Sequence, residues 1–136
     1  MSGRRRGFVW ASFVLATLVV VGVVVQIYLI TSWIFGESGA LDAHKDVGGV
    51  VHPIEVLVFL VGLAGWWGRW RYVGWSFGLA LLGTIQVAFV GDLKDPGSGY
   101  VHGLHGGLAL FVAALAAWIA WREAGALGLR STSSPA

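Results

Sequence analysis

The sequence predicts an all-α protein, a bundle of four helices that cross a lipid bilayer. Apolar residues make up 57% of the 136 residues and charged residues only 12%, whereas a soluble domain averages about 45–50% and about 25%. Four apolar runs each approach the roughly 20 residues that a helix needs to cross the hydrocarbon core. Almost all of the few charges lie between these runs or at the ends of the chain. We therefore expect the surface of the bundle to contact lipid.

The first apolar run covers residues 8–35 and follows a basic segment at residues 1–7. A cleaved signal peptide also begins with basic residues, but its apolar region is only about 7–15 residues long. We therefore expect this run to remain as a membrane helix. The other predicted helices cover residues 43–67, 72–91 and 100–121, and residues 122–136 are predicted to form a polar cytoplasmic tail.

The arginines predict how the helices are oriented. Seven of the nine basic residues are arginines, and all seven lie near the chain ends or between the second and third runs. The other two loops are acidic. Because cytoplasmic loops are rich in arginine and lysine, we expect both termini in the cytoplasm and a multi-pass protein of the cell inner (plasma) membrane. This topology accounts for the basic isoelectric point of about 9.4 without a nucleic acid partner.

Two stretches of the chain resemble each other. Residues 45–52 (Lys-Asp-Val-Gly-Gly-Val-Val-His) match residues 94–102 (Lys-Asp-Pro-Gly-Ser-Gly-Tyr-Val-His) with one residue inserted. The helix before each stretch carries a single glutamine, Gln26 or Gln86. Repeated helix pairs are common in membrane proteins. A bundle of two helix-pair repeats is therefore one prediction, and a chance match is the alternative.

The four histidines are the residues that indicate a function. His44 and His52 lie in the outer part of the second helix, and His102 and His105 lie in the outer part of the fourth. Counted at 1.5 Å per residue from the tryptophans that end these helices, His52 and His105 lie at the same depth, and His44 and His102 form a shallower pair. Two neutral imidazoles can hold a b-type heme inside a bundle. We therefore predict that His52 and His105 bind a heme iron, with His44 and His102 as further cofactor-binding candidates. The alternative for the histidines is an interfacial residue hydrogen-bonded to a loop.

Glu55 is the one acidic residue inside an apolar run. An ionisable side chain at such a depth is costly, so it is usually functional or paired. It follows His52 by three positions, so the two share a face of the helix. Three roles remain open for it: orienting a ligand histidine, carrying a proton, or hydrogen bonding to Gln26 or Gln86 across the bundle.

Two other functions compete with heme binding. Imidazoles and a carboxylate suit zinc, iron or copper, so a non-heme metal site is one alternative, with the ligands His44, His52, Glu55, His102 and His105. A cofactor-free accessory subunit of a membrane complex is the other. The absence of cysteine excludes disulfides and thiolate-bound zinc or iron–sulfur centres. The sequence contains no phosphate loop or dinucleotide fingerprint, so it indicates no class of enzyme.

The order of these features resembles one four-helix half of the heme A synthase family, and also a set of short, uncharacterised four-helix membrane proteins of actinobacterial type. The likeness covers about residues 20–120. It includes an acidic outer loop, a histidine that opens the second helix, the stretch Gln86-Val-Ala-Phe-Val-Gly and the stretch Val101-His102-Gly-Leu-His105.

This resemblance implies a heme held by outer-side histidines of the second and fourth helices. The chain has half the length of such a synthase, lacks cysteine, and carries Asp42 where the family usually has glutamate. The resemblance therefore does not extend to the oxidative chemistry of heme A formation. It leaves membrane electron transfer or heme handling, with a membrane redox partner or a homodimer as the expected partner.

Overall fold

The chain is an α-helical bundle. The computed structural model describes residues 1–92 and 99–130, without the side chains of residues 89–92. Within these ranges the chain forms four helices and no strand, which confirms the all-α prediction: α1 (Gly3–Ile34), α2 (Ala40–Gly65), α3 (Trp70–Asp92) and α4 (Gly99–Leu127). The first five residues of the second predicted repeat, residues 94–98, lie outside the described residues.

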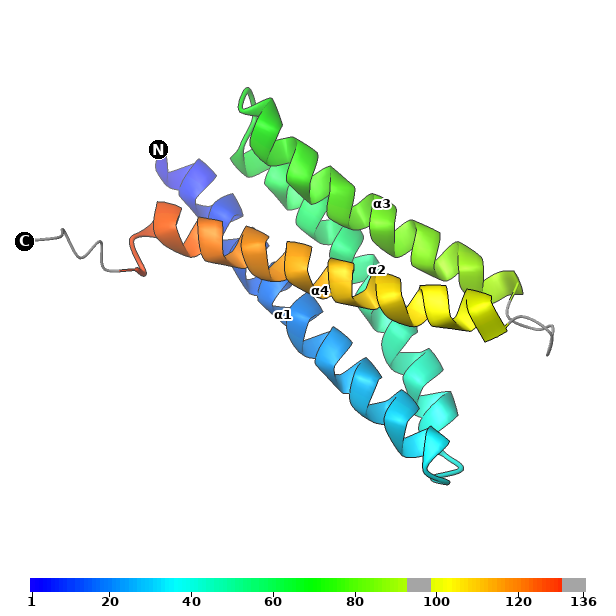
Figure 1. Cartoon of the computed structure of the whole chain (residues 1–136). Coiled ribbons are helices and arrows are strands. Elements are labelled where there is room, and N and C mark those ends of the chain that lie inside the picture. The colour runs from blue at the N-terminus through cyan, green and yellow to red at the C-terminus, as the bar shows by residue number, and fades with distance from the viewer. Residues whose placement is uncertain (93–98, 131–136) are drawn as a thin grey trace, which may run out of the picture.

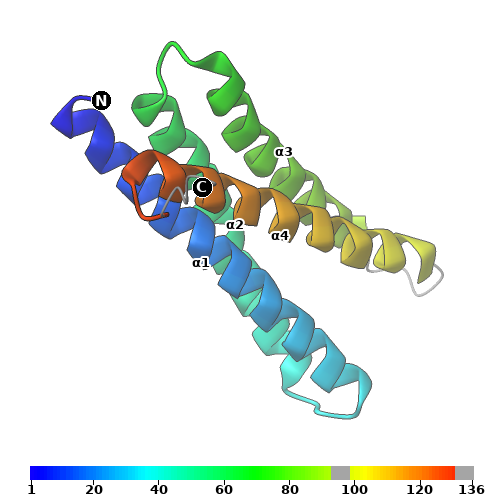
Figure 2. The same cartoon turned by 60° about the vertical axis from the view of Figure 1, so that its left-hand side comes forward.

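The four helices pack in a ring (Figures 1 and 2). Each helix contacts its neighbours in the chain, and α1 also contacts α4, so that α2 and α4 lie diagonally across the bundle. One end, here called the arginine end, contains the start of α1, the α2–α3 turn and the last turns of α4. The opposite end, here called the histidine end, contains the α1–α2 turn and the start of α4. In both views the α1–α2 hairpin and the α3–α4 hairpin diverge toward the histidine end.

The helices pack along seams of small and β-branched residues. The buried positions of α1 follow one another in steps of three and four, and those of α2 do the same: Val9, Ser12, Ala16, Val19 and Val23, then Val51, Glu55, Val58, Gly62 and Gly65. This spacing is typical of helices that cross at a small angle. At Gly22 a Cβ would lie 2.5 Å from the Cγ2 atom of Val51. Such close approach at small residues is how helices associate in lipid.

The outer surface of the bundle is apolar. Three helices, α1, α2 and α4, are long and apolar enough to cross a membrane. In the part of the chain that the structure describes, which omits the side chains at the end of α3, α3 is not among them. Large apolar side chains such as Ile34 and Phe111 are about two-thirds exposed (67% and 66%). An apolar surface of this extent is stable in lipid and not in water, so the structure supports a membrane protein. Four spans and cytoplasmic termini stay predictions.

All four helices are longer than the sequence predicts, and α1 and α4 differ most. Helix α1 begins at Gly3 and not at residue 8. Helix α4 continues to Leu127, although the sequence predicts a polar tail from residue 122. The physical reason is that Glu123 and Leu127 are buried against the other helices, so this polar-looking segment has an inward face.

Candidate functional site

A layer of four polar residues, one from each helix, crosses the histidine end. Nδ1 of His44 in α2 donates a hydrogen bond to the backbone oxygen of Gln26 in α1, over 3.1 Å. His105 in α4 lies close to the backbone of Gln86 in α3. The two imidazole rings meet across the diagonal of the bundle, with centroids 6.3 Å apart and planes inclined at 72°. The layer therefore joins all four helices through two facing imidazoles.

Each of these two rings has a nitrogen available. In His44 the Nδ1 atom is bonded to Gln26, and no described residue bonds to the Nε2 atom. In His105 the Nδ1 atom is buried without a hydrogen-bond partner. His44 therefore resembles a metal-binding histidine, whose second nitrogen donates to a carbonyl and fixes the ring.

Three buried polar atoms of the layer have no hydrogen-bond partner: Oε1 of Gln26, Oε1 of Gln86 and Nδ1 of His105. Leaving a buried polar atom unsatisfied costs about 1–3 kcal/mol, and a membrane interior offers little water to satisfy it. Gly48 leaves space for the side chain of Gln26, because a Cβ at Gly48 would lie 2.6 Å from Nε2 of Gln26. Unsatisfied atoms gathered at one level point to a group that is not part of the chain.

His52 lies apart from this ring pair and has a different partner. Its Nδ1 atom donates a hydrogen bond to Oε2 of Glu55, over 3.1 Å, and Glu55 is only 3% exposed. Both side chains face α3 at Gly83, where a Cβ would overlap the Glu55 carboxylate and lie 3.0 Å from Nδ1 of His52. Of the three roles left open for Glu55, the structure favours the one in which it orients a histidine.

The structure thus regroups the predicted site residues. The sequence pairs His52 with His105 by depth, whereas the ring contact of His105 is with His44. Residue counts from the helix ends give comparable depths only if the helices are parallel. Because the two hairpins diverge, equal counts do not place two residues at the same level (Figure 1). His102 is exposed, three residues before His105. Gln26 and Gln86, which the sequence offers as hydrogen-bond partners of Glu55, both lie in the layer.

The site offers two ligands and not a larger set. Among residues 1–92 and 99–130, no group of three or more histidine, aspartate or glutamate side chains could hold a metal ion. Protein zinc sites use three or four side chains, whereas a heme iron needs only its two axial ligands from the protein. The donor set therefore fits a heme better than a bare metal ion.

A second polar layer, which the sequence analysis missed, crosses the arginine end around Glu123. This carboxyl group is fully buried. Its Oε1 atom accepts hydrogen bonds from Oγ of Ser12 (2.8 Å), Nη2 of Arg122 (3.1 Å) and Nε1 of Trp66 (3.3 Å). Nη1 of Arg122 donates to the backbone oxygen of Tyr72 in α3, over 3.4 Å. This layer takes residues from α1, α3 and α4, together with Trp66, which directly follows α2.

Aromatic rings enclose the arginine of this second layer. The guanidinium of Arg122 lies 4.7 Å from the ring centroid of Tyr72, 5.3 Å from that of Trp66 and 5.4 Å from that of Trp118. Trp66 and Tyr72 are themselves stacked, with centroids 4.7 Å apart. Helical periodicity could have found Glu123, because it follows His105 by eighteen residues, about five full turns, and so shares its inward face.

No family model, curated protein or solved structure matches this chain. The resemblance to half of a heme A synthase therefore stays a prediction. The function has to be inferred from the geometry of the two polar layers. Both contain buried atoms without a hydrogen-bond partner, and the layer at the histidine end also brings two imidazole rings together.

Proposed function

We propose that this protein binds one b-type heme between His44 and His105, near the outer surface of the plasma membrane, and uses it for membrane electron transfer or heme handling. The chain would cross the bilayer four times with both termini in the cytoplasm. The observation that carries the proposal is the pair of imidazole rings from α2 and α4 that face each other across the bundle. This proposal keeps the predicted cofactor and changes the ligand pair.

The spacing of the two rings matches that of an axial ligand pair. A metal–imidazole bond is about 2 Å long, and a ring centroid lies roughly 1 Å beyond the ligating nitrogen. Two imidazoles in line on one iron therefore hold their centroids roughly 6 Å apart, close to the observed 6.3 Å. An edge-to-face contact between two rings can have the same spacing. The unsatisfied atoms Oε1 of Gln26, Oε1 of Gln86 and Nδ1 of His105 favour the ligand interpretation.

Each residue of the layer has a distinct role in this proposal. Heme would supply the one-electron redox chemistry of its iron. His44 and His105 would bind it, and the backbone oxygen of Gln26 would fix the ring of His44. The pair of His52 and Glu55, which is buried nearby in α2, is available to hold or move a proton.

The test is the absorption spectrum of detergent-purified protein reconstituted with hemin. Wild-type protein should show the spectrum of a six-coordinate, low-spin heme. His44→Ala and His105→Ala should each abolish it, because one imidazole alone leaves a five-coordinate iron. His102→Ala is the matched control, since this exposed histidine is one turn from His105, and its spectrum should be that of the wild type.

A further variant separates the two ligand pairs. If His52→Ala loses the low-spin spectrum while His44→Ala keeps it, then His52 and His105 are the ligands, as their depth predicts. The contact between the rings of His44 and His105 is then a packing contact. If wild-type protein binds no hemin at all, the heme proposal is overturned and an accessory subunit without a cofactor becomes the better account.

A further inference from the structure

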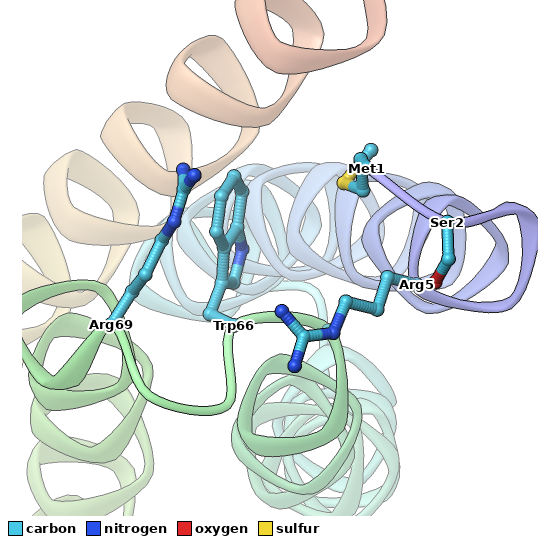
Figure 3. Close-up of a pocket in the computed structure, with 6 residues that line it drawn as sticks. Met1, Ser2, Arg5, Trp66 and Arg69 are labelled. Carbon is cyan, nitrogen blue, oxygen red and sulfur yellow. The ribbon is translucent and has the colours of Figure 1, made fainter.

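A small pocket opens at the arginine end, away from the histidine layer. It has a volume of about 220 Å³ and is lined by Met1, Ser2, Arg5, Gly65, Trp66 and Arg69. Figure 3 shows the Trp66 ring between the Arg69 side chain, which runs alongside it from the α2–α3 turn, and the guanidinium of Arg5, which comes from the start of α1. Two arginines that are far apart in the chain therefore line one pocket, and the heme proposal uses neither of them.

The positive charge of this pocket is not neutralised by the chain. No carboxylate pairs with Arg5 or Arg69 among the described residues, because the buried Glu123 pairs with Arg122. Helices α1 and α3 also begin here, at Gly3 and Trp70. The start of a helix carries free N–H groups and partial positive charge. Arginine side chains and helix starts together favour an anion, and guanidinium groups are suited to phosphate in particular.

The wall of the pocket is held in place by the second polar layer. Trp66 is only 5% exposed, donates from Nε1 to Glu123 and stacks on Tyr72. Arg69 lies over the same indole, 5.7 Å from its centroid. At Gly65 a Cβ would lie 3.2 Å from Val9, so α1 and α2 are in close contact there. The pocket is therefore formed before any ligand binds.

The position of the pocket identifies the source of the phosphate. It lies where the apolar helices end, which is the level of the lipid headgroups in a bilayer. The neighbouring Trp67 and Trp70 are exposed (57% and 61%), and exposed tryptophans at helix ends are typical of the membrane interface. A headgroup bound here would leave its acyl chains along the apolar outer surface of the bundle.

We infer that the pocket between Arg5 and Arg69 binds the phosphate of an anionic phospholipid. Basic pockets between helices at the cytoplasmic side bind such headgroups in other membrane proteins. Here the two guanidinium groups would contact the phosphate, while the fixed indole of Trp66 forms the wall beside it. The lipid would tie the start of α1 to the α2–α3 turn.

The experiment is native mass spectrometry of the full chain in detergent, titrated with phosphatidylglycerol or phosphatidylcholine. The double variant Arg5→Gln/Arg69→Gln should bind phosphatidylglycerol about a hundred-fold more weakly than wild type, since each lost charge-assisted hydrogen bond to the phosphate lowers the affinity about ten-fold. The matched control is Arg4→Gln/Arg71→Gln, which removes the same charge at the same end from residues that do not line the pocket. It should change the affinity by less than about two-fold, because charges that do not contact the phosphate are screened by salt.

Three outcomes would overturn the inference. Equal weakening by the two double variants would mean diffuse attraction and no site. Equal affinity of wild-type protein for phosphatidylcholine and phosphatidylglycerol would mean that the negative charge of the lipid is not recognised. This comparison uses the wild-type protein alone. Displacement of phosphatidylglycerol by millimolar inorganic phosphate would mean that the pocket takes free phosphate and not a lipid.

Discussion

The two polar layers of this bundle differ in how many of their buried polar atoms are hydrogen-bonded within the chain. Both join distant parts of the chain, one around His44 and His105 and the other around Glu123. At the arginine end one carboxylate oxygen accepts three hydrogen bonds and three aromatic rings surround the guanidinium of Arg122. At the histidine end three buried polar atoms have no partner.

This difference separates a structural layer from a binding layer. Polar groups buried in a membrane protein have to be satisfied, and the Glu123 layer does this largely within the chain. Only Oε2 of Glu123 and Nε of Arg122 are left over there. The histidine layer brings two imidazole rings together edge to face and leaves three buried polar atoms without a partner. We therefore expect substitutions at the arginine end to change stability, and substitutions at the histidine end to change what the protein binds.

The largest effect on stability is expected for Glu123→Ala. It removes the acceptor of three donors and leaves Arg122 buried without its partner, and breaking a buried pair in this way costs about 3–5 kcal/mol. Thermal unfolding in detergent, followed by circular dichroism, would measure it. His105→Ala in heme-free protein is the counterpart and should cost less than about 1 kcal/mol, because it removes an already unsatisfied atom. Equal losses in the two variants would break the comparison.

A smaller effect is expected for Gly83→Leu in α3. A side chain at this position meets the carboxylate of Glu55 and the ring of His52, and overpacking of a tight contact costs about 1–3 kcal/mol. Gly74→Leu is the matched control on the same helix, because a Cβ there meets no atom within 4 Å. The same melting experiment compares the two variants. A Gly83→Leu protein as stable as the Gly74→Leu protein would contradict the close packing of α2 against α3.

The smallest effect on stability is expected for Gln26→Leu. This variant separates an effect on stability from an effect on heme binding. This change removes a buried oxygen without a partner, so the heme-free protein should keep its melting temperature or gain slightly. The backbone oxygen that holds the His44 ring is unchanged in this variant. Heme affinity, measured by hemin titration, should still fall up to about ten-fold, because the side-chain oxygen can no longer hydrogen bond to a bound group. A drop in stability together with unchanged heme affinity would show that Gln26 serves packing alone.

Much of the fold could be predicted, because the apolar runs that cause it can be read directly from the sequence. The four apolar runs predict four helices, and the structure has them. The end of α4 could not be read from composition, since Arg122 and Glu123 look like a polar tail unless their inward face is recognised from the spacing to His105. Their partners Ser12 and Trp66 lie on other helices, and nothing local in the sequence joins them.

The candidate site could be predicted in its members but not in its pairing. His44, His105, Gln26 and Gln86 are all named by residue type and by their position in the outer half of the helices. Which imidazoles meet depends on how the two hairpins cross, and residue counts along single helices carry no information on that angle. His52 is instead held by Glu55, three residues away on its own helix.

The most direct test of the central claim, that His44 and His105 share one iron, is electron paramagnetic resonance of the ferric, heme-loaded protein. Two imidazoles with planes inclined at 72° should give the low-spin signal with a large g value that nearly perpendicular axial rings produce, and His44→Ala should convert it to a high-spin signal. A wild-type spectrum that is high-spin, or a low-spin signal that survives His44→Ala unchanged, would contradict the account.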